Sequence, residues 1–476
     1  MENHVQSTEG ARQNATGALN GEATGVQGPE QEPGKKKGLS LVGQMVVAVI
    51  AGFVIGFALL LFKMSIGEDS GLWQTINQLL FVDINSAEGV NGLGLVYDIQ
   101  TLFLAALQLG IVPLVLTSLT LAILNVSSTA KLGRIAGRSI AWFIAFYVIL
   151  AAIAGVIGLF VSSTGVYDVT LPTEGMGEVA AVEAFNPLAI IIDIVPNNLM
   201  ACFSSNDGVL SVIFIAVVMG VFMRKMPEQT KPIRDLFQAI EDLVERYLTF
   251  VINRCAPISI CCMIVRAFAI YGTDYLLPAA AYLVIGTLVG LVLTVTVMPL
   301  AILIKTHHSP VPFMKKTLRM LLITAATTSS SAGYPANVEA AENMGASHEV
   351  SSFVLPTGMV IHMPGTVVMQ IMAVTFIATS AGFDITPVQM IVCAAVAVLI
   401  AIATPTIPMA GTVLIYVVMA GAGFTTDACM LAYALVVAIN YPVGMACIMM
   451  NTLGDAATNV IVSSDEGEMD WDTYNA

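Results

Sequence analysis

The segment Thr-Thr-Ser-Ser-Ser-Ala-Gly-Tyr-Pro at residues 327–335 decides how the rest of the chain is interpreted. Five consecutive hydroxyl side chains, followed by Gly and Pro, lie between apolar segments. In a membrane, polar and helix-breaking backbone of this kind persists only where it is buried in protein or lines a wet cavity. The alternative is a polar surface loop between two spans. A second interruption, Thr-Pro-Thr-Ile-Pro-Met-Ala-Gly at residues 404–411, favours the buried interpretation, because paired interruptions of this kind point to a transporter's binding site.

The composition places the chain in a membrane. Of its 476 residues, 57% are hydrophobic and 11% are charged, and the mean hydropathy is +0.83. Average soluble proteins contain about 25% charged residues, so we expect an integral, multi-pass protein surrounded by lipid. Much of the net charge of −14 lies in acidic loops and in residues 464–476, so it defines no binding surface, and we expect no nucleic-acid partner. The seven cysteines show no metal or redox spacing and are interpreted as small buried apolar residues.

The distribution of basic residues predicts the topology. Residues 1–38 contain almost no large apolar side chain and are expected to form a disordered cytoplasmic tail. The first span is predicted at residues 41–62, directly after three lysines. Further spans are expected near residues 99–124, 139–162, 209–223, 243–271 and 277–304. Basic clusters follow alternate spans and the intervening loops have none, which indicates that these clusters and the N-terminus lie in the cytoplasm. We expect a plasma (inner) membrane protein with both termini on that side.

Two arginines lie well inside an apolar segment. For Arg266 we favour a side chain that extends to the outer interface over a functional role. For Arg254 the sequence offers no partner. From Met320 to Ala476 there is no Lys or Arg, so charge rules give no orientation for the part that contains both interruptions.

The order of short motifs along the chain resembles a known family, the dicarboxylate/amino acid:cation symporters, which include the glutamate transporters. The motifs are Pro113-Leu114-Val115, Leu132-Gly133-Arg134, Ile194-Val195-Pro196-Asn197-Asn198, Ala256-Pro257-Ile258, Ser329-Ser330-Ser331, His362-Met363-Pro364-Gly365-Thr366, Ile407-Pro408-Met409-Ala410-Gly411 and Asn451-Thr452-Leu453-Gly454-Asp455. No single motif is decisive, but the ordered set is specific and covers about Leu39 to Ser463.

This resemblance implies an all-α integral membrane fold of eight transmembrane helices plus two re-entrant helical hairpins, arranged as inverted repeats. It implies a homotrimer that works as an elevator. The scaffold would comprise about residues 39–124 and 186–271, the moving transport domain about residues 132–163 and 277–463, and the acidic cytoplasmic tail residues 464–476.

Asp455 is the leading candidate for a cation ligand. It lies in an apolar run four residues after Asn451, so both side chains share one helix face. A carboxylate at membrane depth must pair, bind a cation or take up a proton, and this part of the chain has no Lys or Arg. The alternative is an Asp at a helix end near the cytoplasmic surface. The resemblance implies a sodium site, and sodium prefers oxygen ligands. The candidate ligands are Asp455, Asn451, His362, Gly358, Met363 and Thr404.

His362 leaves the identity of the ion open. A lone His in an apolar run is more often part of a hydrogen-bonded core, but a titratable imidazole beside a helix break also permits H⁺ in place of Na⁺. One of the family's sodium sites is expected to be absent, because three positions that carry its oxygen ligands in sodium-coupled carriers align here with Phe143, Phe146 and Pro364. Only Tyr147 keeps an oxygen there.

The substrate site is expected where hairpin tips and a helix break meet. Hydroxyl groups and backbone N–H groups at a helix N-terminus favour an anion, and the family binds a substrate carboxylate there. The candidates are Ser329, Ser330, Ser331, Thr366, Pro408, Ala410, Gly411, Gly444, Cys447 and Asn451. Cys447 replaces an Arg that relatives often use for a second carboxylate, and Gly444 replaces an Asp that binds an ammonium group. Asn440 replaces another family Asp, and Ile448 a hydroxyl.

These observations favour a cation-coupled symporter of a small solute with one carboxylate, a neutral amino acid or an organic acid, and not an enzyme. The alternatives are a symporter of dicarboxylates or acidic amino acids, a proton-coupled carrier, and a sensor or channel derived from a transporter. No spacing of Ser, His and Asp supports a nucleophile with its base.

Overall fold

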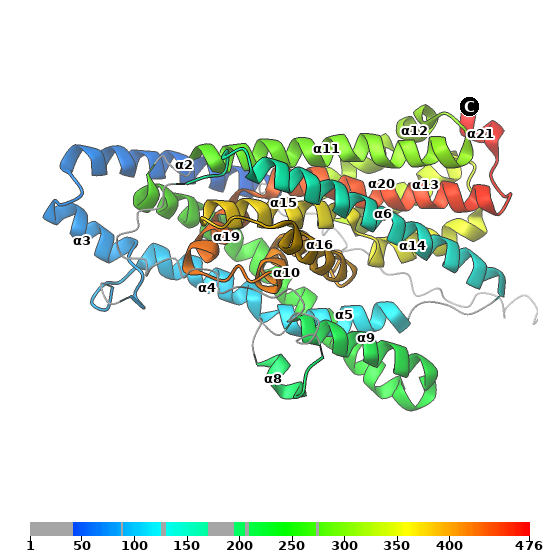
Figure 1. The fold of residues 1–476 in the computed structure, drawn as a ribbon, viewed down its shortest axis with the longest axis horizontal. Coiled ribbons are helices and arrows are strands. Elements are labelled where there is room, and N and C mark those ends of the chain that lie inside the picture. Colours follow the sequence, from blue (N-terminus) through cyan, green and yellow to red (C-terminus); the bar gives the residue numbers. More distant parts are fainter. Residues whose placement is uncertain (1–40, 87–88, 125–129, 170–194, 205–208, 273–275) are drawn as a thin grey trace, which may run out of the picture. The chain divides into compact units, whose positions relative to one another are not determined.

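The computed structural model describes residues 41–86, 89–124, 130–169, 195–204, 209–272 and 276–476, and these residues contain helices and turns but no strand. The predicted tail at residues 1–38 and residues 186–194 of the predicted scaffold lie outside the described residues. The described part of the chain therefore confirms the all-α class (Figure 1).

Residues 41–306 contain long apolar helices and two short ones. They are α2 (Leu41–Ile66), α3 (Gly71–Leu80), α4 (Leu95–Leu109), α5 (Ile111–Leu124), α6 (Ala130–Ser162), α8 (Leu199–Phe203), α9 (Val209–Lys225), α10 (Pro227–Tyr271) and α11 (Leu276–Thr306). The second half is built of shorter helices. They are α12 (Pro310–Thr327), α13 (Ser330–Asn343), α14 (His348–Ile361), α15 (Pro364–Ser380), α16 (Pro387–Ile402), α17 (Ala410–Val413), α18 (Ile415–Gly421), α19 (Asp427–Ile439), α20 (Tyr441–Asp465) and α21 (Trp471–Asn475).

Seven segments of the described chain are long and apolar enough to cross a membrane, and one of them is the combined run of α14 and α15 at His348–Ser380. The expected span at residues 209–223 corresponds to α9, whose 17 described residues fall just short of that length. A multi-pass membrane protein is thus confirmed, while the count of eight stays a prediction.

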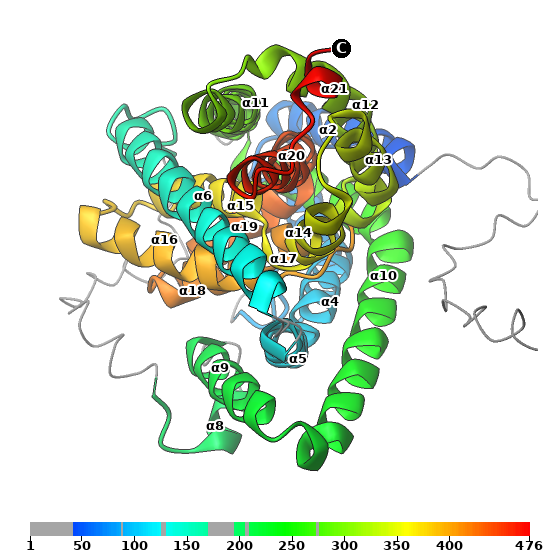
Figure 2. The ribbon, with the colours of Figure 1, turned by 90° about the vertical axis from the view of Figure 1, so that its right-hand side faces the viewer.

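Helices α15 and α20 form the centre of the second half. Every residue of α15 is buried, and so is α20 from Met450 to Ser463. Around them α6, α11, α14 and α16 make contact, and Figure 2 shows α15 and α20 enclosed by these helices. A helix that is buried on all sides contacts protein instead of lipid. Asp455, at 1% exposure within α20, is therefore not a helix-end residue near the surface, and that alternative is wrong.

Both polar interruptions form the tips of helical hairpins. Helices α12 and α13 are joined at Thr328 and Ser329, and Ser329 caps α13 by accepting a hydrogen bond from the backbone N–H of Ala332. Thr328 has φ +49°, a left-handed conformation that is costly for a β-branched residue. In the second hairpin α16 leads to a loop that ends at Met409, with φ +61°. Both tips carry buried residues, so the surface-loop alternative is wrong.

Arg266 is enclosed by other parts of the protein. It is buried in protein, its Nε donates to the carbonyl oxygen of Phe81 at 3.1 Å, and its guanidinium lies 4.9 Å from the ring centre of Tyr97. A backbone carbonyl and an aromatic face satisfy the guanidinium within the protein, and the position of Arg266 relative to the outer interface stays a prediction. Arg254 is exposed on α10.

The acidic C-terminal segment packs against the protein. Arg134 and Arg138 at the start of α6 donate to the Glu466 carboxylate. The Trp471 ring stacks on His308 with ring centres 3.6 Å apart, and the buried Tyr474 donates to the carbonyl oxygen of Ser309 at 2.9 Å. Figure 1 shows α21 beside α12 at the same end of the helices.

Candidate substrate and cation site

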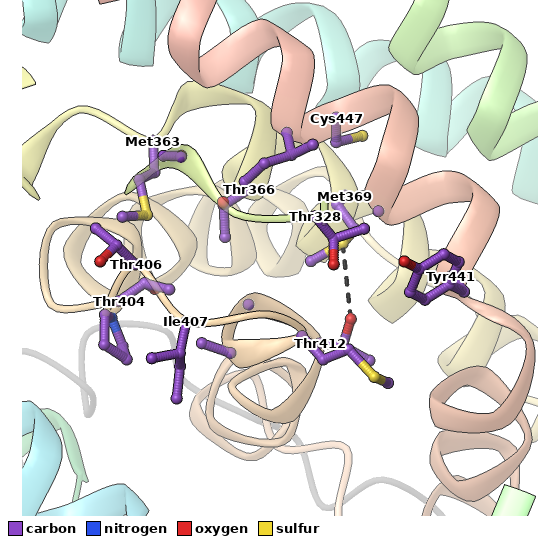
Figure 3. A pocket seen from close by; sticks show the side chains of 17 residues that line it. Thr328, Met363, Thr366, Met369, Thr404, Thr406, Ile407, Thr412, Tyr441 and Cys447 are labelled. Carbon is purple, nitrogen blue, oxygen red and sulfur yellow. Dashed lines mark hydrogen bonds between the residues drawn. The ribbon is translucent and has the colours of Figure 1, made fainter. Parts of the chain in front are cut away.

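A cavity of about 50 Å³ lies where the two hairpin tips meet α15 and α20 (Figure 3). Its lining consists of Thr328, Ser330, Met363, Thr366, Met369, Thr404, Pro405, Thr406, Ile407, Met409, Ala410, Gly411, Thr412, Tyr441, Gly444, Cys447 and Ile448. None of these described lining side chains is charged. Polar contacts with a solute would therefore come from hydroxyl groups, thioethers and backbone.

A direct hydrogen bond joins the two hairpin tips. The Ser329 hydroxyl donates to the carbonyl oxygen of Thr406 at 2.9 Å and lies 2.9 Å from the Ser331 hydroxyl. Beside it, the Ser330 hydroxyl is buried and has no hydrogen-bond partner in the described protein. A buried hydroxyl without a partner is costly, so Ser330 is ready to bind a polar group in the cavity.

Asn451 organises the helix break between α14 and α15. Met363, the residue before α15, supplies no side-chain cap. The Asn451 side-chain oxygen instead accepts hydrogen bonds from the backbone N–H groups of Gly365 at 2.7 Å and Thr366 at 3.3 Å. Helices α15 and α20 must approach closely for this, and a Cβ on Gly365 would lie 1.9 Å from the Cys447 carbonyl oxygen. Asn451 therefore caps a helix with the oxygen that the sequence suggested for a cation.

Asp455 and His362 form a buried pair. The Asp455 Oδ1 atom lies 2.9 Å from His362 Nδ1, and both side chains are inaccessible to solvent. Gly358 lies against the same carboxylate, since a Cβ there would meet Asp455 Oδ1. The other imidazole nitrogen, Nε2, is buried and has no hydrogen-bond partner in the described protein. This site has a carboxylate and an imidazole, but within the described residues no group of three or more His, Cys, Asp and Glu could hold a metal ion.

Aromatic side chains enclose the imidazole. Phe143 stacks on His362 with ring centres 4.3 Å apart, and Phe146 and Tyr147 lie at 5.9 and 5.6 Å. Tyr147 donates to the carbonyl oxygen of Ile361 at 2.8 Å and accepts from the N–H of Met363 at 2.7 Å. The Tyr147 oxygen therefore holds the helix break, and the two phenylalanines offer no oxygen ligand.

The structure divides the sequence-predicted residues into groups. Of the substrate candidates, Ser330, Thr366, Ala410, Gly411, Gly444 and Cys447 line the cavity. Ser329 joins the tips, Ser331 is exposed, Asn451 caps α15 and Pro408 is absent from the lining. Of the cation candidates, Asp455, His362 and Gly358 lie together, whereas Met363 and Thr404 line the substrate cavity.

The sequence predicted that the tip at residues 404–411 encloses the substrate, and Thr406 and Ile407 of this tip line the cavity. Other lining residues were not predicted, chiefly Thr328, Met369, Thr412 and Tyr441. Thr412 and Met369 lie inside apolar helical runs, where nothing local distinguishes a lining residue from a core residue.

Known proteins resemble this chain over most of its length. The family model described as the sodium:dicarboxylate symporter family matches residues 41–465. The chain is 26% identical over 382 residues to the proton/sodium-glutamate symport protein of Geobacillus stearothermophilus, covering 78% of this chain and 87% of that protein. It is also 26% identical over 401 residues to the C4-dicarboxylate transport protein of Rhodospirillum rubrum, covering 78% of this chain and 82% of that protein.

Proposed function

Because the chain belongs to the sodium:dicarboxylate symporter family, we propose that it is a cation-coupled symporter of a small solute that carries a single carboxylate. The observation that carries the proposal is the uncharged cavity at the hairpin tips. Ser330 lies there at the N-terminus of α13 with an unpartnered hydroxyl. Backbone N–H groups at a helix N-terminus favour negative charge, so this corner suits the carboxylate.

The same cavity disfavours a second carboxylate. A buried carboxylate without a cationic partner costs several kcal/mol. Cys447 lines the cavity where relatives often place an Arg, and neither Arg254 nor Arg266 is part of the lining. The named substrates of the two relatives, glutamate and C4-dicarboxylates, are therefore expected to bind weakly here, and a neutral amino acid or a monocarboxylic acid is expected to bind better.

Asp455 would couple transport of the solute to that of the cation. Its carboxylate is fully buried, and its only described ionic partner is an imidazole. A transported Na⁺ would take oxygen ligands from Asp455 and nearby backbone, whereas a transported H⁺ would reside on the Asp455–His362 pair. A second cation near Phe143, Phe146 and Pro364 lacks ligands, so fewer cations should accompany each solute than in sodium-coupled amino-acid carriers.

We also propose the architecture that the family resemblance implies. The chain would form a homotrimer in the plasma (inner) membrane, with cytoplasmic termini, eight transmembrane helices and two re-entrant hairpins in inverted repeats. The packing supports two domains. In one, α10 contacts α2, α4 and α5, and α5 contacts α9; in the other, α11, α12, α14 and α15 surround α20. The helices around α10 would form the scaffold, and those around α20 would form the transport domain that moves in the elevator mechanism.

A thermal-shift screen of the full-length protein tests this function. Amino acids, monocarboxylates and dicarboxylates are added with and without sodium, since a ligand that binds only the folded state raises its stability, by about 2.7 kcal/mol at 100 times Kd. Monocarboxylates or neutral amino acids should raise the melting temperature, and sodium or pH should change the size of the rise. Stabilisation by succinate or glutamate alone would overturn the proposal.

A further inference from the structure

Asn440 lies at the junction of α19 and α20 and connects α11 to the cavity. The Tyr282 hydroxyl on α11 donates to Asn440 Oδ1 at 2.5 Å. Asn440 Nδ2 donates to the Thr412 hydroxyl at 2.8 Å and to the Met369 sulfur at 3.2 Å. All four side chains are at most 4% exposed. Only Met369 and Thr412 reach the cavity lining.

The chemistry of these partners fixes the direction of each hydrogen bond. A thioether sulfur accepts hydrogen bonds but cannot donate one. The amide NH₂ must therefore face Met369, and its oxygen must face Tyr282. With both amide hydrogens used on Met369 and Thr412, the Thr412 hydroxyl acts as an acceptor toward Asn440.

This direction leaves the proton of the Thr412 hydroxyl available to the cavity. Its only described acceptor is the Met369 sulfur at 4.0 Å, the dashed contact in Figure 3. A thioether is a weak acceptor, and 4.0 Å is long for a hydrogen bond. An oxygen atom of a bound solute would be a better partner. Two other cavity threonines differ, since Thr404 donates to the carbonyl oxygen of Ile400 and Thr328 to that of Thr327, each at 2.8 Å. Thr366 resembles Thr412, because its hydroxyl accepts from Asn451 Nδ2 at 3.2 Å.

We propose that Thr412 is a specificity residue that donates its hydroxyl proton to an uncharged oxygen of the substrate, a hydroxyl or a carbonyl. The inference rests on the proposed function and narrows it to monocarboxylates that carry a second, neutral oxygen. The second group is neutral because a single hydroxyl satisfies one neutral acceptor, whereas a carboxylate would need a cationic partner that the lining lacks. Asn440 and Tyr282 are positioning residues, since they act through Thr412.

Matched solute pairs test this assignment. The affinities of the full-length protein for 2-, 3- and 4-hydroxybutyrate are compared with that for butyrate, and the affinity for L-threonine with that for L-2-aminobutyrate, by titration calorimetry at fixed sodium and pH. In the unmodified protein at least one hydroxylated solute should bind about threefold to tenfold tighter than its partner, which is the effect of one hydrogen bond. This ratio should fall to about one in Thr412→Val and persist in Thr412→Ser.

Two further variants distinguish the positioning of Thr412 by Asn440 from a general effect on folding. In Asn440→Leu no side-chain amide donates to Thr412, so the Thr412 hydroxyl is no longer held as an acceptor and the ratio should fall toward that of Thr412→Val. Thr375→Val is the matched control, because Thr375 is fully buried on α15, donates to the carbonyl oxygen of Ile371 at 2.8 Å and is outside the lining. It should keep the ratio of the unmodified protein.

Three results would contradict parts of this account. If Thr412→Val retains the ratio, Thr412 has no role in specificity. If monocarboxylates bind but no hydroxylated member is preferred, the inference fails while the proposed function stands. If dicarboxylates bind and none of these solutes does, the proposed function fails and the inference with it.

Discussion

At the scale of single residues, the Asp455 carboxylate carries the coupling argument. The sequence predicted that it is buried and unpaired with Lys or Arg, because none occurs after Arg319. The family resemblance grouped His362 with Asp455 at one cation site, but it did not predict their direct contact at 2.9 Å, which the packing of α14 against α20 brings about across 93 positions of sequence. The role of Asn451 as a helix cap was hidden for the same reason.

Replacing Asp455 tests that argument. Asp455→Asn removes the charge at nearly constant size, and cation-dependent uptake should fall by about tenfold or more, because loss of a buried charge partner is worth a few kcal/mol. Asp465→Asn, at the exposed end of α20, should transport normally. Uptake into proteoliposomes at several sodium concentrations and pH values is the measurement; an Asn variant with unchanged cation dependence would exclude Asp455 as the coupling residue.

At the scale of elements, hydropathy located spans but not helix ends. The span predicted at residues 243–271 belongs to α10, which begins at Pro227, and the one at residues 139–162 belongs to α6, which begins at Ala130. Both helices continue into polar sequence, as helices do when they leave the hydrocarbon layer. Hydropathy reports membrane depth, whereas helix ends depend on local signals, such as Pro227 in the first turn of α10.

The contact between α15 and α20 is a close backbone approach that depends on glycine. Gly365→Ala should destabilise the protein by about 1–3 kcal/mol or more, the range for overpacking, because its Cβ would meet the carbonyl oxygen of Cys447. Gly137→Ala is the control, since no atom lies within 4 Å of a Cβ there and Ala favours the helix. Thermal unfolding in detergent measures both; equal melting temperatures would mean that the two helices separate at little cost.

The C-terminal segment should hold the ends of α6 and α12 that it contacts. Its anchor Tyr474 is fully buried, and Lys316 on α12 donates to the carbonyl oxygen of Thr473 at 2.6 Å. Deleting residues 471–476 should lower the melting temperature and speed amide hydrogen exchange at the start of α12. Lys315→Gln, which alters only a neighbouring lysine, is the control for Lys316→Gln, which should reproduce part of the effect. Unchanged exchange in the deletion variant would show that the segment restrains nothing.

Glu466 makes the same region sensitive to acid. Its hydrogen bond from Arg134, with the nearby charge of Arg138, holds the pKa of the Glu466 carboxyl below its usual range. A lowered folded-state pKa contributes stability that is present above the ordinary carboxyl pKa and is lost as pH falls through the folded value. The unmodified protein should therefore melt higher than Glu466→Gln at neutral pH, and the difference should vanish in acid. A difference in melting temperature that grows in acid would contradict a lowered pKa of Glu466 in the folded protein.

At the scale of the whole molecule, the helices differ in how much of their side-chain surface is buried. Helices α2 and α11 expose large apolar side chains, as expected of surfaces that face lipid, while α15 and most of α20 are enclosed. The ordered motifs predicted the all-α membrane fold and both hairpin tips, because Gly, Pro and hydroxyl residues break helices visibly. The relay from Tyr282 through Asn440 to Thr412 could not be foreseen, since it joins three elements by side-chain geometry alone.

If one sodium site is absent near His362, as proposed above, the complete transport cycle should move fewer cations. With Phe143 and Phe146 against the imidazole, fewer cations should move with each solute than in sodium-coupled amino-acid carriers. Reversal potentials in vesicles, measured while the sodium and proton gradients are varied separately, give the stoichiometry and the ion. A ratio as high as that of glutamate carriers would contradict the proposed loss of a site.

Gradient-driven accumulation tests the central claim most directly. Purified protein is reconstituted into proteoliposomes, and uptake of a radiolabelled monocarboxylate from the thermal-shift screen is followed under an imposed inward sodium or proton gradient. The account predicts that the solute rises above its external concentration and that an ionophore which dissipates the coupling gradient abolishes the excess. Uptake that stops at equal concentrations on both sides, with or without the ionophore, would contradict a coupled symporter.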